Sequence, residues 1–183
     1  MNFIQHLNLE GKHAQFSPSQ PSWLRYDDEK AIEVYQNRKA VEMGTKLHAW
    51  AKMTIDLRQK QPKSKNTLCM YINDAIGYKM NTEVVLYYSP RFFGTADAIC
   101  FRNNKLRIHD LKTGKIPAHM EQLEIYAALF CLEYKMKPTN IEMELRIYQN
   151  NEVLVHNPEV DDITHIMDRI VHLDKLLENM END

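Results

Sequence analysis

The sequence predicts an α/β protein in which helices flank a mixed β-sheet. Stretches with apolar residues at helical spacing surround a block of short segments rich in Val, Ile and Tyr, which is typical of strands. The segments run as helices, three strands, a helix, two strands and a last helix, and this order favours a sheet covered by helices. The 183 residues contain no internal repeat or linker, so we expect a single domain over residues 1–183.

The N-terminal part of the chain is expected to be irregular and then helical. Residues 1–27 include a run rich in Ser and Pro that breaks any helix, which predicts an irregular segment. A charged helix should run from Asp28 to Gln61, ended by Pro62 and with Gly44 as a candidate interruption. A second helix is expected from about Thr67 to Lys79.

Three strands are expected next, joined as an antiparallel meander. They are Thr82–Tyr88, Phe92–Phe101 and Lys105–Lys112, and Asn103-Asn104 forms the tight second turn. The short turns leave no room for a crossover, so neighbouring strands should pair directly.

The rest of the chain is expected to add a helix, two strands and an acidic C-terminal helix. The predicted elements are a helix from His119 to Met136, strands Ile141–Gln149 and Glu152–His156, and a helix within residues 158–183. The last helix has an apolar residue every three or four positions from about residue 160 to 180, which predicts a buried stripe.

Charge is distributed unevenly along the chain, although the net charge is only −2. Residues 91–115 contain six Lys or Arg and two acids, whereas residues 152–183 contain two Lys or Arg and nine acids. The basic middle is suited to a polyanion, and the acidic helix should face away from it. Two ordinary solvated faces remain the alternative.

Composition favours an intracellular protein without a structural metal cluster. No apolar run reaches the roughly 18 residues of a membrane span, and residues 1–16 lack the pattern of a secretory signal, so we expect a cytoplasmic protein without a membrane partner. The three cysteines have no CxxC spacing and are expected to be reduced thiols, with neither zinc nor an iron–sulfur cluster.

Two acidic residues on neighbouring predicted strands are the candidate reaction centre. Alternation places Leu106, Ile108, Asp110 and Lys112 on one face of the third strand, and Thr95, Asp97, Ile99 and Phe101 on one face of the second. If the hairpin brings Asp97 and Asp110 to the same side, two carboxylates meet. Carboxylates and water suit Mg²⁺ or Mn²⁺.

Lys112 extends this centre toward phosphate chemistry. A lysine two residues beyond a metal ligand can orient a water or neutralise charge on a reacting phosphate, so the set suits phosphodiester hydrolysis. A surface Asp–Lys ladder worth less than about 1 kcal/mol is the alternative.

Four ordered motifs resemble the PD-(D/E)XK nuclease superfamily. They are the stretch Gly44–His48, the G-x-x-D of Gly94–Asp97, the D-x-K of Asp110–Lys112, and the Q-x-x-x-Y of Gln122–Tyr126. They are most similar to the RecB-like branch, which includes phage and CRISPR-associated exonucleases. The resemblance covers roughly residues 44–126 and implies a restriction-endonuclease-like fold. Ala96 stands where the superfamily's name has proline, and the four-cysteine cluster of some relatives is absent, so no iron–sulfur centre is expected.

The resemblance also implies roles for individual residues. Lys112 would be the catalytic lysine, while Gln122 and Tyr126, four residues apart on one helical face, would orient the site or the DNA strand. The implied metal ligands are His48, Asp97, Asp110 and the backbone carbonyl of Leu111.

Further polar residues near these motifs have two interpretations each. Arg91 and Lys115 are candidate DNA-binding residues, although plain solvent exposure explains them equally well. Glu83 can join the acidic cluster or be an ordinary strand-edge carboxylate. His109 should point to the face opposite Asp110 and is not expected to be a ligand.

The sequence thus predicts a metal-dependent DNA nuclease, an exonuclease or end-processing enzyme of recombination, repair or phage replication. Its expected partners are DNA, Mg²⁺ or Mn²⁺, and either further copies of the chain or a recombination or repair protein. One alternative is a catalytically inactive nuclease-like protein for DNA binding or assembly. A second is a hydrolase or transferase acting on smaller phosphoesters.

Overall fold

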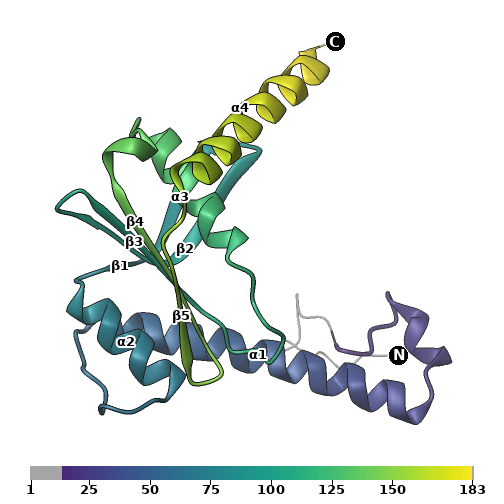
Figure 1. Cartoon of the computed structure of the whole chain (residues 1–183). Helices are drawn as coiled ribbons and strands as arrows, with labels where there is room; N and C mark the ends of the chain where they lie inside the picture. The colour runs from purple at the N-terminus through teal and green to yellow at the C-terminus, as the bar shows by residue number, and fades with distance from the viewer. Residues whose placement is uncertain (1–13, 183) are drawn as a thin grey trace, which may run out of the picture. The chain divides into compact units, whose positions relative to one another are not determined.

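The computed structural model describes residues 14–182, in which helices and a five-stranded mixed sheet form an α/β architecture (Figure 1). The chain divides after Lys46 into two compact units. The prediction of a single domain stays a prediction. No helix in residues 14–182 is long and apolar enough to cross a membrane.

The first unit contains a short 3-10 helix, Pro21–Arg25, and the beginning of helix α1 (Asp28–Asp56). The Trp23 indole N–H donates to the Ser17 carbonyl at 3.0 Å. Residues 1–13 of the predicted irregular segment lie outside the described residues, and the remainder is irregular apart from the 3-10 turn. The predicted interruption at Gly44 is wrong, because α1 is continuous through it.

The second unit, from Leu47, contains the sheet. Helix α2 (Thr67–Gly77) is capped by Asn66, whose side chain accepts hydrogen bonds from two backbone N–H groups of the first turn. Strands β1 (Asn81–Ser89), β2 (Phe92–Arg102) and β3 (Lys105–Leu111) pair in antiparallel order. The predicted meander is therefore confirmed.

The later elements turn the meander into a mixed sheet. Helix α3 (Glu121–Glu133) crosses over so that β4 (Glu142–Gln149) pairs parallel to β3. A 3-10 turn, Pro138–Asn140, precedes β4, strand β5 (Glu152–His156) pairs antiparallel to β4, and helix α4 (Val160–Asn182) follows. The order in the sheet is β1-β2-β3-β4-β5, and the predicted mixed sheet flanked by helices is confirmed.

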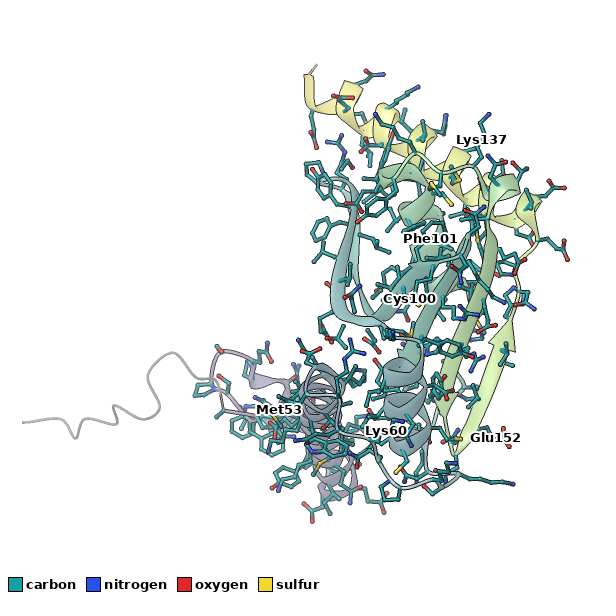
Figure 2. The ribbon with its side chains drawn as sticks, turned by 90° about the vertical axis from the view of Figure 1, so that its left-hand side faces the viewer. Met53, Lys60, Cys100, Phe101, Lys137 and Glu152 are labelled. Atoms are coloured by element: carbon teal, nitrogen blue, oxygen red, sulfur yellow. The ribbon has the colours of Figure 1, made fainter. Side chains whose placement is uncertain are left out.

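Apolar side chains form two cores, one on each face of the sheet. The α3–α4 core includes Leu106, Ile108, Leu123, Leu145 and Ile163. The α2 core joins α2 to the end of α1 and includes Ala51, Ile72, Ala98, Leu111 and Tyr148. Consecutive residues of β2 point to different cores: Cys100 belongs to the α2 core, whereas Phe101 contacts Phe130 of the α3–α4 core (Figure 2).

Candidate active site

The two predicted carboxylates lie where β2 and β3 separate. Pairing of β2 with β3 ends at Ala98 and His109, and Asp97 and Asp110 are the residues next to this last pair. Beyond this pair, β3 is bonded by the side chain of Asp97 instead of its backbone: Asp97 Oδ2 accepts a hydrogen bond from Leu111 N at 2.9 Å. The Asp97 carboxylate therefore lies beside the backbone of Leu111, the residue that follows Asp110.

Side chains alternate strictly along β3 but not along β2. Leu106 and Ile108 pack in the α3–α4 core, while the His109 ring lies against Tyr78 on the other face, as predicted. On β2, however, Ala96 and Ile99 belong to the same core although they are three residues apart. The prediction that residues 95, 97, 99 and 101 share one face is therefore wrong.

A distortion in β1 explains the break in β2. Thr82 pairs with Ala98 and Val84 pairs with Ala96, which leaves Glu83 opposite Asp97. Glu83 has a φ of 52°, a left-handed conformation that interrupts regular strand geometry. Three acidic residues, Glu83, Asp97 and Asp110, thus follow one another across three strands at the point of distortion.

Lys112 connects the buried Asp110 to helix α3. The Lys112 ammonium donates to Asp110 Oδ1 at 3.2 Å and to Gln122 Oε1 at 2.8 Å. It also lies 2.9 Å from Asp110 Oδ2, but not at a hydrogen-bonding angle, and this enclosed oxygen has no hydrogen-bond partner among the described residues. The Asp110 side chain is 5% exposed, so this buried oxygen is ion-paired with the ammonium but makes no hydrogen bond.

The chain of contacts continues from α3 back to β2. Gln122 Nε2 donates to the Tyr126 hydroxyl at 3.4 Å, and this hydroxyl donates to the Thr95 carbonyl at 2.8 Å. Gly94 permits this approach, because a Cβ there would lie 2.8 Å from Tyr126 Cε1. The structure thus brings together Asp97, Asp110, Lys112, Gln122 and Tyr126. The space requirement at Gly94 was missed, although a glycine inside a strand is itself a signal of close approach.

His48 reaches the carboxylates from the end of α1. Its Nδ1 lies 3.5 Å from Asp97 Oδ2. Of the predicted ligands, Leu111 contributes its N–H to Asp97, and the metal role of its carbonyl stays a prediction.

Burial and mutual repulsion make the two carboxylates costly to ionise. Burial, followed by the charge of Asp110, raises the pKa of Asp97 from 3.8 to about 6, while the Leu111 N–H and His48 act in the opposite direction. Burial also raises the pKa of Asp110, and the Lys112 ammonium offsets part of this effect. A cation between the carboxylates would relieve both penalties.

The residues fit a small oxygen-ligated cation. The carboxylate oxygens of Asp97 and Asp110 are the hard donors that Mg²⁺ and Mn²⁺ prefer, and Asp110 Oδ2 makes no hydrogen bond among the described residues. Within residues 14–182, no three His, Cys, Asp or Glu side chains are arranged as a complete metal site. A site built on Asp97 and Asp110 would need backbone and water oxygens as its further ligands.

Gln149, at the end of β4, holds the loop that joins β3 to α3. Its Nε2 donates to the carbonyls of Gly114 and Ile116, both at 2.7 Å, and its Oε1 accepts from Ala118 N at 3.1 Å. Lys115 is exposed on this loop, next to the Lys112 end of the site. Sequence reasoning missed Gln149, since a polar last residue of a strand carries no distinguishing pattern.

Arg91 is engaged elsewhere. Its guanidinium lies 3.0 Å from Asp174 and 2.8 Å from Glu181, both on α4. Ser89 also donates to Asp174, at 2.7 Å. The structure does not bring Arg91 to the carboxylates, and its predicted DNA contact stays a prediction.

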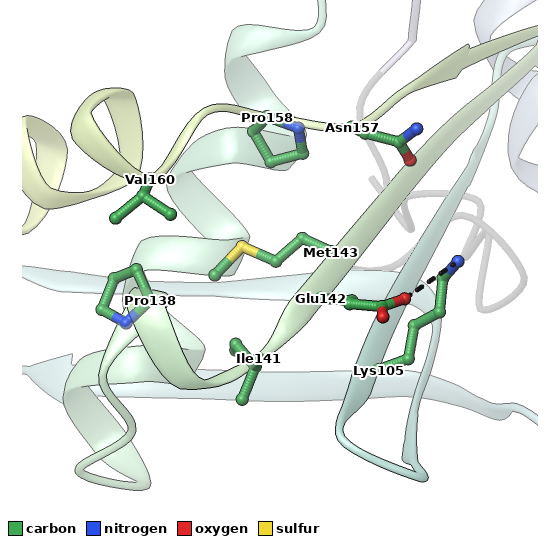
Figure 3. A pocket seen from close by; sticks show the side chains of 8 residues that line it. All are labelled: Lys105, Pro138, Ile141, Glu142, Met143, Asn157, Pro158 and Val160. Carbon is green, nitrogen blue, oxygen red and sulfur yellow. Dashed lines mark ion pairs between the residues drawn. The ribbon is translucent and has the colours of Figure 1, made fainter.

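The pocket in Figure 3 does not belong to this centre. It has a volume of about 260 Å³ and lies at the start of β4, where Lys105 and Glu142 pair at 3.7 Å. Its charged residues neutralise one another, and none of the predicted site residues lines it.

Comparisons with known proteins give a family but no activity. A family model described as "Protein of unknown function (DUF2800)" matches residues 30–182. Searches of the curated proteins and of the solved structures returned no match.

Proposed function

The chain belongs to the DUF2800 family, and we propose that it is a metal-dependent nuclease that hydrolyses phosphodiester bonds in DNA. One observation carries the proposal. Asp110 is buried, one of its oxygens makes no hydrogen bond among the described residues, and Lys112 connects it to Gln122 of α3. The four ordered motifs that resemble RecB-like nucleases supply the residues of this network.

The topology supports a restriction-endonuclease-like fold. In this proposal the β1-β2-β3 meander carries the two acids, and α3 with the parallel strand β4 forms the adjoining crossover. The network uses this arrangement, because Lys112 ends β3 and Gln122 opens α3.

Asp97 and Asp110 would hold Mg²⁺ or Mn²⁺, with His48 and the Leu111 carbonyl as further ligands. Such a cation, when bound, polarises a phosphoryl oxygen and makes a bound water more acidic.

The protein's own residues then prepare the phosphate for attack. Gln122 and Asp110 hold the Lys112 ammonium in place, so it is available to a phosphate oxygen or the attacking water without reorganisation. Tyr126 fixes Gln122 and is itself anchored on Thr95. The ammonium also offsets the negative charge that repels a phosphate from two carboxylates.

Digestion of end-labelled linear DNA, compared with circular DNA, tests this proposal. We expect degradation in Mg²⁺ or Mn²⁺, none in EDTA, and sparing of circular DNA if the enzyme works from ends. Asp110→Asn and Lys112→Ala should each lower the rate by about 10²-fold or more. Glu152→Gln, an exposed carboxylate outside the network, is the matched control and should retain activity.

Other results would overturn the proposal. Equal activity of both variants and the parent would place the reaction elsewhere. A folded parent that binds DNA but leaves it intact in both metals would favour the inactive DNA-binding or assembly protein. Cleavage of small phosphoesters with little dependence on salt would favour a hydrolase or transferase of small phosphoesters, because the binding of a polymer weakens steeply with ionic strength.

A further inference from the structure

The side-chain amide of Gln149 is fully engaged by the loop that follows β3. Its Nε2 donates to the carbonyls of Gly114 and Ile116, and its Oε1 accepts from Ala118 N. The amide therefore uses both of its N–H donors and its oxygen, a combination that among neutral side chains only glutamine and asparagine offer. Among residues 14–182, loop residues 113–119 make no other hydrogen bond.

This loop joins two members of the Lys112 network. Lys112 directly precedes the loop, and its backbone N–H donates to the carbonyl of Tyr148, the neighbour of Gln149 on β4. Gln122 follows the loop in the first turn of α3, and its Oε1 accepts from the Lys112 ammonium at 2.8 Å. The distance between the ammonium and its amide partner thus depends on the path that the loop takes.

The loop has little support apart from Gln149. Residues 113–117 are all exposed, and the side chain at the tip, Ile116, is 85% exposed. Apolar packing resumes only at Ala118 and Met120, which contact the α3–α4 core. An exposed segment with so few contacts opens easily on its own, so the three hydrogen bonds to Gln149 are what select one path.

We propose that Gln149 is a positioning residue of the reaction, which acts through Lys112 by fixing the loop between Lys112 and Gln122. The inference rests on the proposed nuclease function. An ammonium that is held in place before the substrate arrives stabilises developing negative charge without reorganisation. Gln149 supplies this order from outside the site, since its amide contacts only the backbone of the loop.

Two variants of Gln149 test the inference in the full chain. Gln149→Leu removes all three hydrogen bonds, and Gln149→Glu keeps the shape but turns an ionised carboxylate toward two carbonyl oxygens. A misplacement of about 1 Å can lower a rate by about 10²-fold. On end-labelled linear DNA in Mg²⁺, we expect kcat to fall about 10- to 100-fold in both variants, with KM within about threefold of the parent. Gln59→Leu changes an exposed glutamine after α1 and should leave both constants unchanged.

A double-mutant cycle separates positioning from a general structural role. If Gln149 acts through Lys112, its loss has nothing left to disturb once the ammonium is gone. Lys112→Ala and the double variant Lys112→Ala/Gln149→Leu should therefore have the same kcat within about twofold. A general loss of structure would lower kcat by the same factor in both backgrounds. The cycle is repeated with Gln149→Glu, so it does not depend on the folding of one variant.

Trypsin cleavage after the exposed Lys115 follows the loop without any need for activity. Cleavage requires local opening, so it should be about tenfold faster in Gln149→Leu than in the parent. Equal cleavage rates would show that Gln149 does not hold the loop and would overturn the inference.

The kinetic results have distinct meanings. In an active parent, an unchanged kcat for both Gln149 variants, or equal losses with and without Lys112, would overturn the role of Gln149 and leave the nuclease proposal intact. A rise in KM alone would assign the loop to DNA binding and overturn the positioning of Lys112. A folded parent that cleaves no DNA would overturn both proposals.

Discussion

Replacing Asp97 by asparagine should stabilise the metal-free protein at neutral pH. The pKa of Asp97 is raised from 3.8 to about 6. Each pKa unit corresponds to about 1.4 kcal/mol, so the ionised carboxylate costs the fold up to about 3 kcal/mol. The side chain is 19% exposed and interacts with Asp110, and we therefore expect a gain of about 1–3 kcal/mol for Asp97→Asn. Asparagine can still accept the hydrogen bond from Leu111 N.

The sign of the pH dependence follows from the same shift. A carboxyl group with a raised pKa favours folding while it is protonated, and this contribution is lost as the pH rises through about 6. The parent and Asp97→Asn should therefore be equally stable near pH 3 and diverge between pH 4 and 7. At pH 8 the variant should have its full advantage.

Urea unfolding in EDTA at several pH values measures this difference. Asp56→Asn is the matched control with the opposite sign, because hydrogen bonds from Lys52 and Thr82 lower the pKa of Asp56, and this variant should lose stability at neutral pH. Millimolar Mn²⁺ should then stabilise the parent more than Asp97→Asn, since a ligand of the folded state adds stability by mass action. A variant that is less stable than the parent at pH 8 in EDTA would refute the argument from burial and repulsion.

Three further predictions concern the surroundings of the site. Gly94→Ala should lower the free energy of unfolding by about 1–3 kcal/mol in urea, because the new Cβ displaces the anchored Tyr126 ring. Gly77→Ala, whose new Cβ would meet no neighbouring atom, should be neutral or stabilising in the same assay. Lys135→Gly should stabilise by about 0.5–1 kcal/mol, because Lys135 has a φ of 53°; thermal unfolding of this variant showing a loss would contradict this. Arg91→Ala should lower the free energy of unfolding by about 1 kcal/mol, because it removes the ion pairs to α4, and should leave the salt dependence of DNA binding unchanged. If the slope of log affinity against log salt concentration fell by about one, Arg91 would instead contact a phosphate.

The strands and their pairing were predictable because the turn residues and the residue composition of each strand mark the strand limits that the structure has. Asn103 and Asn104 both adopt left-handed conformations in the β2–β3 turn, and the β5 limits Glu152–His156 agree with the sequence prediction. The alternation of β3 then followed from strand geometry alone. It placed Asp110 and Lys112 on one face, and the two are in contact.

Helix ends were harder to predict because the left-handed position after α1, α2 and α3 is occupied by Arg or Lys instead of glycine. Helix α1 ends at Asp56 instead of Gln61, and the chain turns at Arg58, which has a φ of 56°. Gln59 N donates to the Thr54 carbonyl in the six-residue pattern of a Schellman ending. Lys79 and Lys135 occupy the same left-handed position after α2 and α3, where a basic side chain also complements the helix dipole.

Helix α3 is shorter than its apolar pattern. The prediction ran from His119 to Met136, whereas the helix spans Glu121–Glu133. Met120 and Met136 still pack against the α3–α4 core from outside the helix, so the periodicity continues beyond the hydrogen-bonded turns.

Contacts between distant segments were beyond the reach of the sequence. Tyr71 fits the apolar stripe of α2, and no local pattern indicates that its ring packs edge-to-face on Tyr148 of β4. The left-handed conformation of Glu83 is likewise not indicated by its residue type, because glutamate seldom adopts a positive φ. Such features depend on register and packing, which a single sequence does not encode in any local pattern.

The parallel pairing of β3 with β4 has a consequence for the newly synthesised chain. When translation has passed α3, the acids, Lys112, Gln122 and Tyr126 have all been made, but β4 has not. Lys112 N donates to the Tyr148 carbonyl at 2.9 Å, and Gln149 holds the following loop, so both supports come from later residues. Pairing across a crossover is also slow compared with hairpin formation. The residues of the candidate site are therefore synthesised before the strand that supports them, and the site can reach its final geometry only after β4 has paired with β3.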